Sequence, residues 1–306
     1  MDTLPKGYGE SSGVDEVPLW IQAWLSTLDA NRRHQDVCDR RLDGVGDWVL
    51  QRNEFESWRG SKDGSGNPTL LCYGGQGVGK TYIRYLSILW KPQTMLTSDK
   101  ISSLVIDTLR EQTYGQNIAV LGLYCDYQAQ REQSAVNMIG GLLSQVSLGA
   151  TRVPDKIQSA FEESRLRGGQ GLRLPDMLSL FIQVVSSLDR VYICVDAMDE
   201  LLPMNRFEFL RALQQIIQEA PNTRLFLTGR PHIRGELDKH LTKGAYSMHI
   251  VPDQGDIARY ISRKLDDDDD RDPDLMTENL RNDIMKIMLE KSSEMLVRET
   301  ITSLNH

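Results

Sequence analysis

The sequence predicts an α/β fold in which helices flank a parallel five-stranded sheet, with further helical segments before and after this core. From residue 69 onward, short runs of aliphatic, aromatic and β-branched residues alternate with helical patterns, as parallel strands and their crossover helices do. A glycine-rich segment follows the first run and an aspartate follows the third. Both features therefore fall where parallel strands end, which is where such sheets gather functional groups.

The composition is that of a globular protein, with 40% hydrophobic and 25% charged residues in a chain of 306. The net charge of −8 weighs against a nucleic-acid or anionic-membrane partner, which would require a basic face. No apolar run approaches the roughly 18 residues of a transmembrane helix, so we expect a cytoplasmic protein. The four cysteines are interpreted as reduced and mostly buried: Cys38, Cys72, Cys125 and Cys194. The five histidines show no zinc-ligand spacing with these cysteines.

The chain before the sheet is predicted to be a loose leader over 1–17 and a helical segment over 18–60. Within it, the pattern over 19–29 places several apolar side chains on one helical stripe: Trp20, Ile21, Trp24, Leu25 and Leu28. Val49, Phe55 and Trp58 follow near turn signals, and a loop is expected over 61–68.

The core is expected to span residues 61–252. Its predicted strands are Thr69–Tyr73, Ile118–Tyr124, Val191–Val195, Arg224–Thr228 and Tyr246–Val251. Its predicted helices are Ala135–Val146, Leu174–Leu188, Phe207–Glu219 and Ile233–Leu241. Strands separated by helices imply right-handed crossovers, so the sheet should be parallel and covered on both faces.

The tail over 253–306 is predicted to be helical at Gly255–Leu265 and Thr277–Met295. Between these helices, the aspartates Asp266–Asp270 are interpreted as a solvated loop rather than a metal site, because like charges in a row repel one another. The last residues turn polar where a helix would need aliphatic ones, so we expect the natural protein to continue.

The strongest chemical signal is a complete GxxxxGK[ST] phosphate-binding loop directly after the first strand. It consists of Gly74, Gly75, Gln76, Gly77, Val78, Gly79, Lys80 and Thr81. Glycines let several backbone N–H groups surround a phosphate without a Cβ in the way, at the positive end of the following helix. Lys80 is expected to reach the β and γ phosphates, and the Thr81 hydroxyl to bind Mg²⁺.

A second signal is the apolar strand Val191–Val195, which delivers Asp196 to the same sheet edge as the phosphate loop. Asp196 is predicted to hold Mg²⁺ through its water shell, as in a Walker B element. Asp199 or Glu200, just beyond it, can polarise an attacking water.

A third signal is the strand Arg224–Thr228, which is followed by Gly229 and Arg230. An arginine at this edge can contact the γ-phosphate, because its guanidinium fork matches phosphate oxygens. The alternative is an ordinary surface arginine before a proline. We favour the phosphate contact, because fixed charge near a transferring phosphoryl group contributes most to catalysis.

In this order the segments GGQGVGKT, VYICVDAMDEL and RLFLTGRP resemble the NACHT branch of the STAND-type, AAA-like P-loop NTPases. The likeness is closest to the fungal-type members, whose NTPase module is also called a nephrocystin-3-like N-terminal domain, and it spans roughly residues 20–295. It implies a switch in which an ADP-bound closed state opens with ATP, oligomerises and signals. By this resemblance Lys80 and Thr81 bind phosphate and Mg²⁺, Asp196 binds the metal, Asp199 and Glu200 position water, and Arg230 senses the γ-phosphate.

The segment 82–100 departs from this family pattern, in which GKT runs directly into an aliphatic helix. Here that helical stripe comes only later, at Ile101, Leu104, Val105 and Leu109. We interpret 82–100 as an insertion, with retained intron sequence or an error of gene prediction as its source. The alternative is that Tyr82–Trp90 is the helix after the loop and Ile101–Leu109 a second helix.

The sequence thus favours ATP binding and slow Mg²⁺-dependent hydrolysis in a signalling switch, with homo-oligomers formed through the NTPase domain. GTP stays open, because no base-reading motif is recognisable and only the resemblance favours ATP. The alternative function is a non-hydrolysing interaction scaffold that keeps the fold, with nucleotide binding impaired by the insertion and by the missing C-terminal part. A small-acceptor kinase is weaker, because no lid-like arginine cluster is present.

Overall fold

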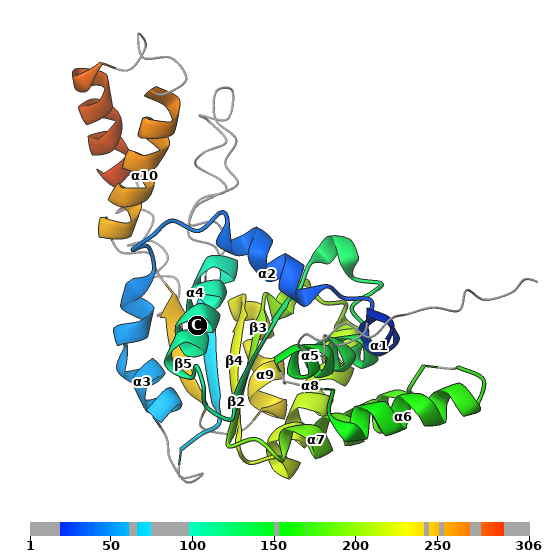
Figure 1. Ribbon diagram of the computed structural model, residues 1–306. Helices are drawn as coiled ribbons and strands as arrows, with labels where there is room; N and C mark the ends of the chain where they lie inside the picture. Colours follow the sequence, from blue (N-terminus) through cyan, green and yellow to red (C-terminus); the bar gives the residue numbers. More distant parts are fainter. Residues whose placement is uncertain are drawn as a thin grey trace, which may run out of the picture.

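The computed structural model describes residues 19–60, 66–74, 98–149, 153–169, 171–241, 245–250, 254–269 and 277–290. These residues form a central sheet between two layers of helices, with a helical pair set apart from it near the carboxyl end of the described chain (Figure 1). The arrangement is the predicted α/β architecture, a parallel five-stranded sheet flanked by helices.

The sheet has five strands in the order β2-β3-β4-β1-β5, and every neighbouring pair is parallel. The strands are β1 (Thr69–Gly74), β2 (Ile118–Tyr124), β3 (Arg190–Asp196), β4 (Thr223–Gly229) and β5 (Tyr246–Ile250). All the predicted strands are confirmed, with ends that differ by at most one residue. Since β3, β4 and β1 are neighbours, the three chemical motifs start from adjacent strand ends.

One face of the sheet is covered by α5 (Ala135–Gly149), α7 (Leu174–Val185), α8 (Pro203–Glu219) and α9 (Arg234–His240). Outside this layer lie α1 (Leu19–Leu25) and α6 (Asp155–Leu166). The other face is covered by α3 (Asn53–Gly60) and α4 (Ser98–Gln112), while α2 (Ala30–Cys38) packs on α4 and β2 (Figure 1). The outlying pair is α10 (Gln254–Asp269) and the helical residues 278–290.

Two expectations about helices are wrong. The predicted helix over 19–29 ends at Leu25, because Asp29 caps a new helix by accepting a hydrogen bond from the Arg32 N–H at 3.0 Å. Trp20 is accordingly 52% exposed and packs on Phe161. The aspartate run is not a loop throughout, since α10 continues to Asp269. α2 lies within the predicted helical segment 18–60 but was not predicted as a separate helix, and no helix was predicted at α6, because both contain few apolar residues.

Strand alternation decides which way the site residues point. Tyr192 and Cys194 of β3 and Phe226 of β4 belong to the core beneath α3 and α4. Because side chains alternate with a period of two, Asp196 and Thr228 extend these rows toward the same face. The carboxylate that ends β3 is therefore presented to α4.

The edge strand β2 is protected by a side chain of α5. Gln145 is 9% exposed; its Oε1 accepts the Gly122 N–H at 2.9 Å and its Nε2 donates to the Gly122 carbonyl at 2.9 Å. We expect Gln145→Leu to lower the free energy of unfolding by about 2 kcal/mol, because both backbone groups lose a buried partner. Urea unfolding measures this, with the exposed Gln218→Leu as a control that changes stability by less than about 0.5 kcal/mol. Equal stability of the two variants would contradict the edge-capping role.

Candidate functional site

The centre of the candidate site is Asp196, the last residue of β3, which is only 3% exposed. Its Oδ1 accepts two hydrogen bonds of 2.6 Å, from the hydroxyls of Ser102 on α4 and Thr228 on β4. Hydrogen bonds to a carboxyl group fix its direction. The sheet and α4 thus present an oriented carboxyl group at the carboxyl edge.

Ser102 and Thr228 were not among the predicted site residues. Ser102 is 1% exposed on the buried side of α4, so its hydroxyl needs a partner there. Thr228 also accepts the Ala197 N–H at 2.9 Å, so it bridges the carboxylate and the backbone that follows it. The only sequence signals for these residues are a serine within the helical stripe and a threonine at a strand end, and both patterns are common.

The chain turns sharply after Asp196. Ala197 has φ +53°, a left-handed conformation that costs a non-glycine residue about 1–2 kcal/mol. This turn starts the short helix η3 (Met198–Glu200), which carries the two remaining acidic candidates.

Asp199 and Arg230 form an ion pair, with 3.1 Å between Asp199 Oδ2 and Arg230 Nε. Asp199 Oδ1 also accepts the Arg230 N–H at 3.1 Å, and the Asp199 side chain is 6% exposed while that of Arg230 is 37% exposed. Gly229, between β4 and Arg230, lets Ile233 pack closely, because a Cβ there would lie 2.7 Å from Ile233 Cδ1. Asp199 therefore holds Arg230 in place.

Glu200 is in a different situation, although it is the next residue. It is half-buried, and its Oε2 accepts the Tyr127 N–H at 3.2 Å. Burial raises the pKa of Glu200, the nearby Asp199 and Asp126 carboxylates raise it further, and the Tyr127 N–H partly opposes them. Among the described residues Arg230 pairs with Asp199, and its charge lowers the pKa of Glu200 only as a smaller contribution. A carboxylate with a raised pKa suits a proton acceptor better than one held in an ion pair.

Of the predicted phosphate loop, the structure describes only the first residue, Gly74. Gly74 ends β1, and Tyr73 stands in register with Gly229 of β4, so the chain enters the loop beside Arg230. Gly75, Gln76, Gly77, Val78, Gly79, Lys80 and Thr81 lie outside the described residues. The described chain resumes at Ser98 with α4, which packs on β2, β3 and β4; residues 82–97 are outside it, so the insertion stays a prediction.

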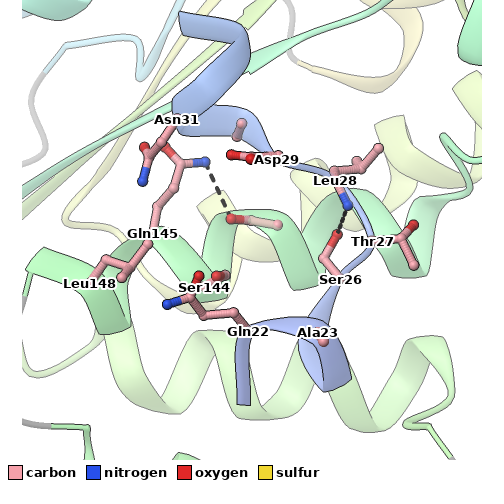
Figure 2. A pocket seen from close by; sticks show the side chains of 12 residues that line it. Gln22, Ala23, Ser26, Thr27, Leu28, Asp29, Asn31, Ser144, Gln145 and Leu148 are labelled. Atoms are coloured by element: carbon pink, nitrogen blue, oxygen red, sulfur yellow. Dashed lines mark hydrogen bonds between the residues drawn. The ribbon is translucent and has the colours of Figure 1, made fainter. Parts of the chain in front are cut away.

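A separate hollow of about 230 Å³ lies against α5, which covers the other face of the sheet from α4. It is lined by the link between α1 and α2 and by α5, including Ser26, Asp29, Ser144 and Gln145 (Figure 2). None of the predicted site residues that the structure describes borders it.

Residues 99–230 match the family model described as Nephrocystin 3, N-terminal. The resemblance predicted from the motifs is confirmed over this segment. It runs from the start of α4 to Arg230 and thus contains Ser102, Asp196, Glu200 and Thr228.

Among solved structures, the chain is similar to a Walker-type ATPase of Pyrococcus abyssi at 15% identity, with a TM-score of 0.46 and coverage of 87% of this chain and 77% of that one. It is also similar to Drosophila ORC bound to DNA (14%, TM-score 0.42, coverage 81% and 55%) and to Cdc6p from Pyrobaculum aerophilum (15%, TM-score 0.39, coverage 79% and 52%). The chain thus spans about half of the latter two proteins. No curated protein matches the sequence, and no helix in the described ranges is long and apolar enough to cross a membrane.

Proposed function

We propose that this protein binds ATP with Mg²⁺ and hydrolyses it slowly, as the switch module of a NACHT-type signalling protein. The observation that carries the proposal is the buried Asp196 carboxylate, fixed by Ser102 and Thr228 at the edge where β1 leads into GGQGVGKT. A carboxylate at this place relative to a phosphate loop is what nucleotide hydrolysis requires.

Each residue at the edge has a distinct role in this proposal. Oxygen donors suit Mg²⁺, so Asp196 and Thr81 would hold the ion, which neutralises charge on the phosphate oxygens. Glu200 accepts the proton of the attacking water. Arg230 would donate to the γ-phosphate, and its ion pair with Asp199 holds the guanidinium at this edge.

The switch itself follows from that pair. A γ-phosphate would draw the Arg230 guanidinium away from Asp199. The conformation of the chain between the end of β4 and α9 would then depend on whether ATP or ADP is bound. Homo-oligomers through this domain and a cytoplasmic signalling role complete the proposal, and GTP remains the alternative nucleotide.

The test is calorimetric titration of ATP, ADP and GTP, each with Mg²⁺, into the purified chain of residues 1–306. We expect micromolar ATP binding that weakens at least about tenfold in Lys80→Ala, because the lysine contributes a charge-assisted contact to phosphate. Lys239→Ala, an exposed lysine of α9, is the matched control and should bind as wild type. A folded chain that binds none of the nucleotides would overturn the proposal and favour the non-hydrolysing scaffold.

A further inference from the structure

A second group of reactive side chains lies beyond the Asp196 edge, where α2 packs on α4 (Figure 1). His34 and Cys38 stand one helical turn apart on α2 and face Asp107 of α4. Their ligand atoms all lie within 4.8 Å of one another. The expectation that no histidine has ligand spacing with a cysteine is therefore wrong for His34 and Cys38.

The distances in this group match those of a tetrahedral metal site. Cys38 Sγ lies 3.5 Å from His34 Nε2 and 3.5 Å from Asp107 Oδ2, and His34 Nε2 lies 2.8 Å from Asp107 Oδ1. Zinc bond lengths of about 2.3 Å to sulfur and 2.0–2.1 Å to nitrogen or oxygen place tetrahedral ligand pairs about 3.3–3.6 Å apart. Both sulfur distances lie in that range, and the nitrogen–oxygen pair would open by about half an ångström.

The surroundings of the group also fit a metal site. The other ring nitrogen of His34, Nδ1, lies 2.7 Å from the Tyr124 hydroxyl, and Arg41 donates to Asp107 Oδ2 at 2.7 Å. Histidine ligands are commonly oriented through their second nitrogen, and ligating carboxylates are commonly hydrogen-bonded as well. His34 is 8% exposed, so its ring is held rather than mobile.

An ion-pair network of Arg41, Asp107 and His34 would account for part of this arrangement. In that network the Cys38 thiol donates a hydrogen bond to Asp107 Oδ2 at 3.5 Å, and the same position leaves its sulfur at a zinc-ligand distance from both His34 Nε2 and Asp107. Arg41 also leaves room for a metal, since an ionised carboxylate offers about four acceptor positions and Arg41 uses one oxygen.

We propose that His34 Nε2, Cys38 Sγ and an Asp107 oxygen bind one Zn²⁺, with a fourth position open to water. On binding, three metal–ligand bonds form, the thiol proton of Cys38 passes to solvent, and the ring proton of neutral His34 resides on Nδ1, which donates it to the Tyr124 oxygen. The ion ties the N-terminal helix α2 to α4, the helix that carries Ser102. This site does not depend on nucleotide binding.

Cobalt substitution tests the proposal on the untagged full chain, because a Co²⁺–thiolate bond gives a near-ultraviolet charge-transfer band. We expect one equivalent of Co²⁺ to produce this band, and Zn²⁺ to abolish it. Cys38→Ser should lack the band and bind Zn²⁺ at least about tenfold more weakly in competition with a chromophoric chelator. Asp107→Asn should keep the band but lose Zn²⁺ affinity.

Cys125→Ser is the matched control, because Cys125 is a buried thiol, 4% exposed, that does not belong to the group of His34, Cys38 and Asp107. That variant should bind Co²⁺ as wild type does. A wild-type chain that takes up no stoichiometric Co²⁺ or Zn²⁺, or a Cys38→Ser variant that retains the band, would overturn the proposal. Melting temperatures with and without Zn²⁺ give an independent readout, with a rise expected in wild type and none in Cys38→Ser.

Discussion

Glu200→Gln is expected to lower the rate of ATP hydrolysis about 10³-fold while leaving ATP binding within about twofold of wild type. The amide keeps the shape of the side chain and an oxygen that can accept the Tyr127 N–H, so the contact between residue 200 and Tyr127 should be kept. What the variant loses is the carboxylate that takes a proton from water. Single-turnover hydrolysis with excess enzyme measures this loss separately from product release.

The matched control is Glu208→Gln, an exposed position on α8 that should hydrolyse at the wild-type rate. The pH profile gives a second check, since only the ionised form of Glu200 accepts a proton. Because burial raises the pKa of Glu200, the wild-type rate should increase with pH through a value above the ordinary 4.5. This acidic limb should be absent in Glu200→Gln. A limb that persists, or a rate loss below tenfold, would assign the proton acceptor to another group.

Trp58→Ala is expected to lower the free energy of unfolding by about 3–5 kcal/mol, the range for deleting a large buried side chain. Trp58 is fully buried, and its ring lies 5.6 Å from Phe55, 5.5 Å from Tyr192 and 6.0 Å from Phe226. Its Nε1 also donates to the Pro68 carbonyl at 3.1 Å, just before β1 begins. The substitution therefore removes both packing and a hydrogen bond between α3 and the sheet.

Urea denaturation followed by circular dichroism measures the change in stability. Trp20→Ala removes the same side chain from a site that is 52% exposed, and it should cost about 1 kcal/mol through its contact with Phe161. Similar losses for the two variants would show that α3 does not contribute to the main core. A loss confined to Trp58→Ala would mean that this helix is part of the unit that folds with the sheet.

Much of the fold could be predicted because its signals are local. β2, β3 and β4 contain buried apolar runs, as expected for the centre of a parallel sheet, and such runs are visible without knowing what covers them. The edge strand β5 instead alternates buried and exposed residues. The position of Asp196 could be predicted for the same reason, because a residue at the end of a parallel strand lies at the carboxyl edge of the sheet. Short polar helices such as α2 and α6 carry no comparable pattern, so the sequence did not reveal them.

The sequence by itself determined the parallel α/β core, the order of its strands along the chain and the acidic and arginine candidates at its carboxyl edge. Only the tertiary structure decided that Ser102 and Thr228 bind Asp196, that Asp199 rather than Glu200 pairs with Arg230, and that Asp107 meets His34 and Cys38. The physical reason is that these contacts join side chains from different elements. Their distances depend on how helices pack on the sheet, which no local pattern in the chain encodes.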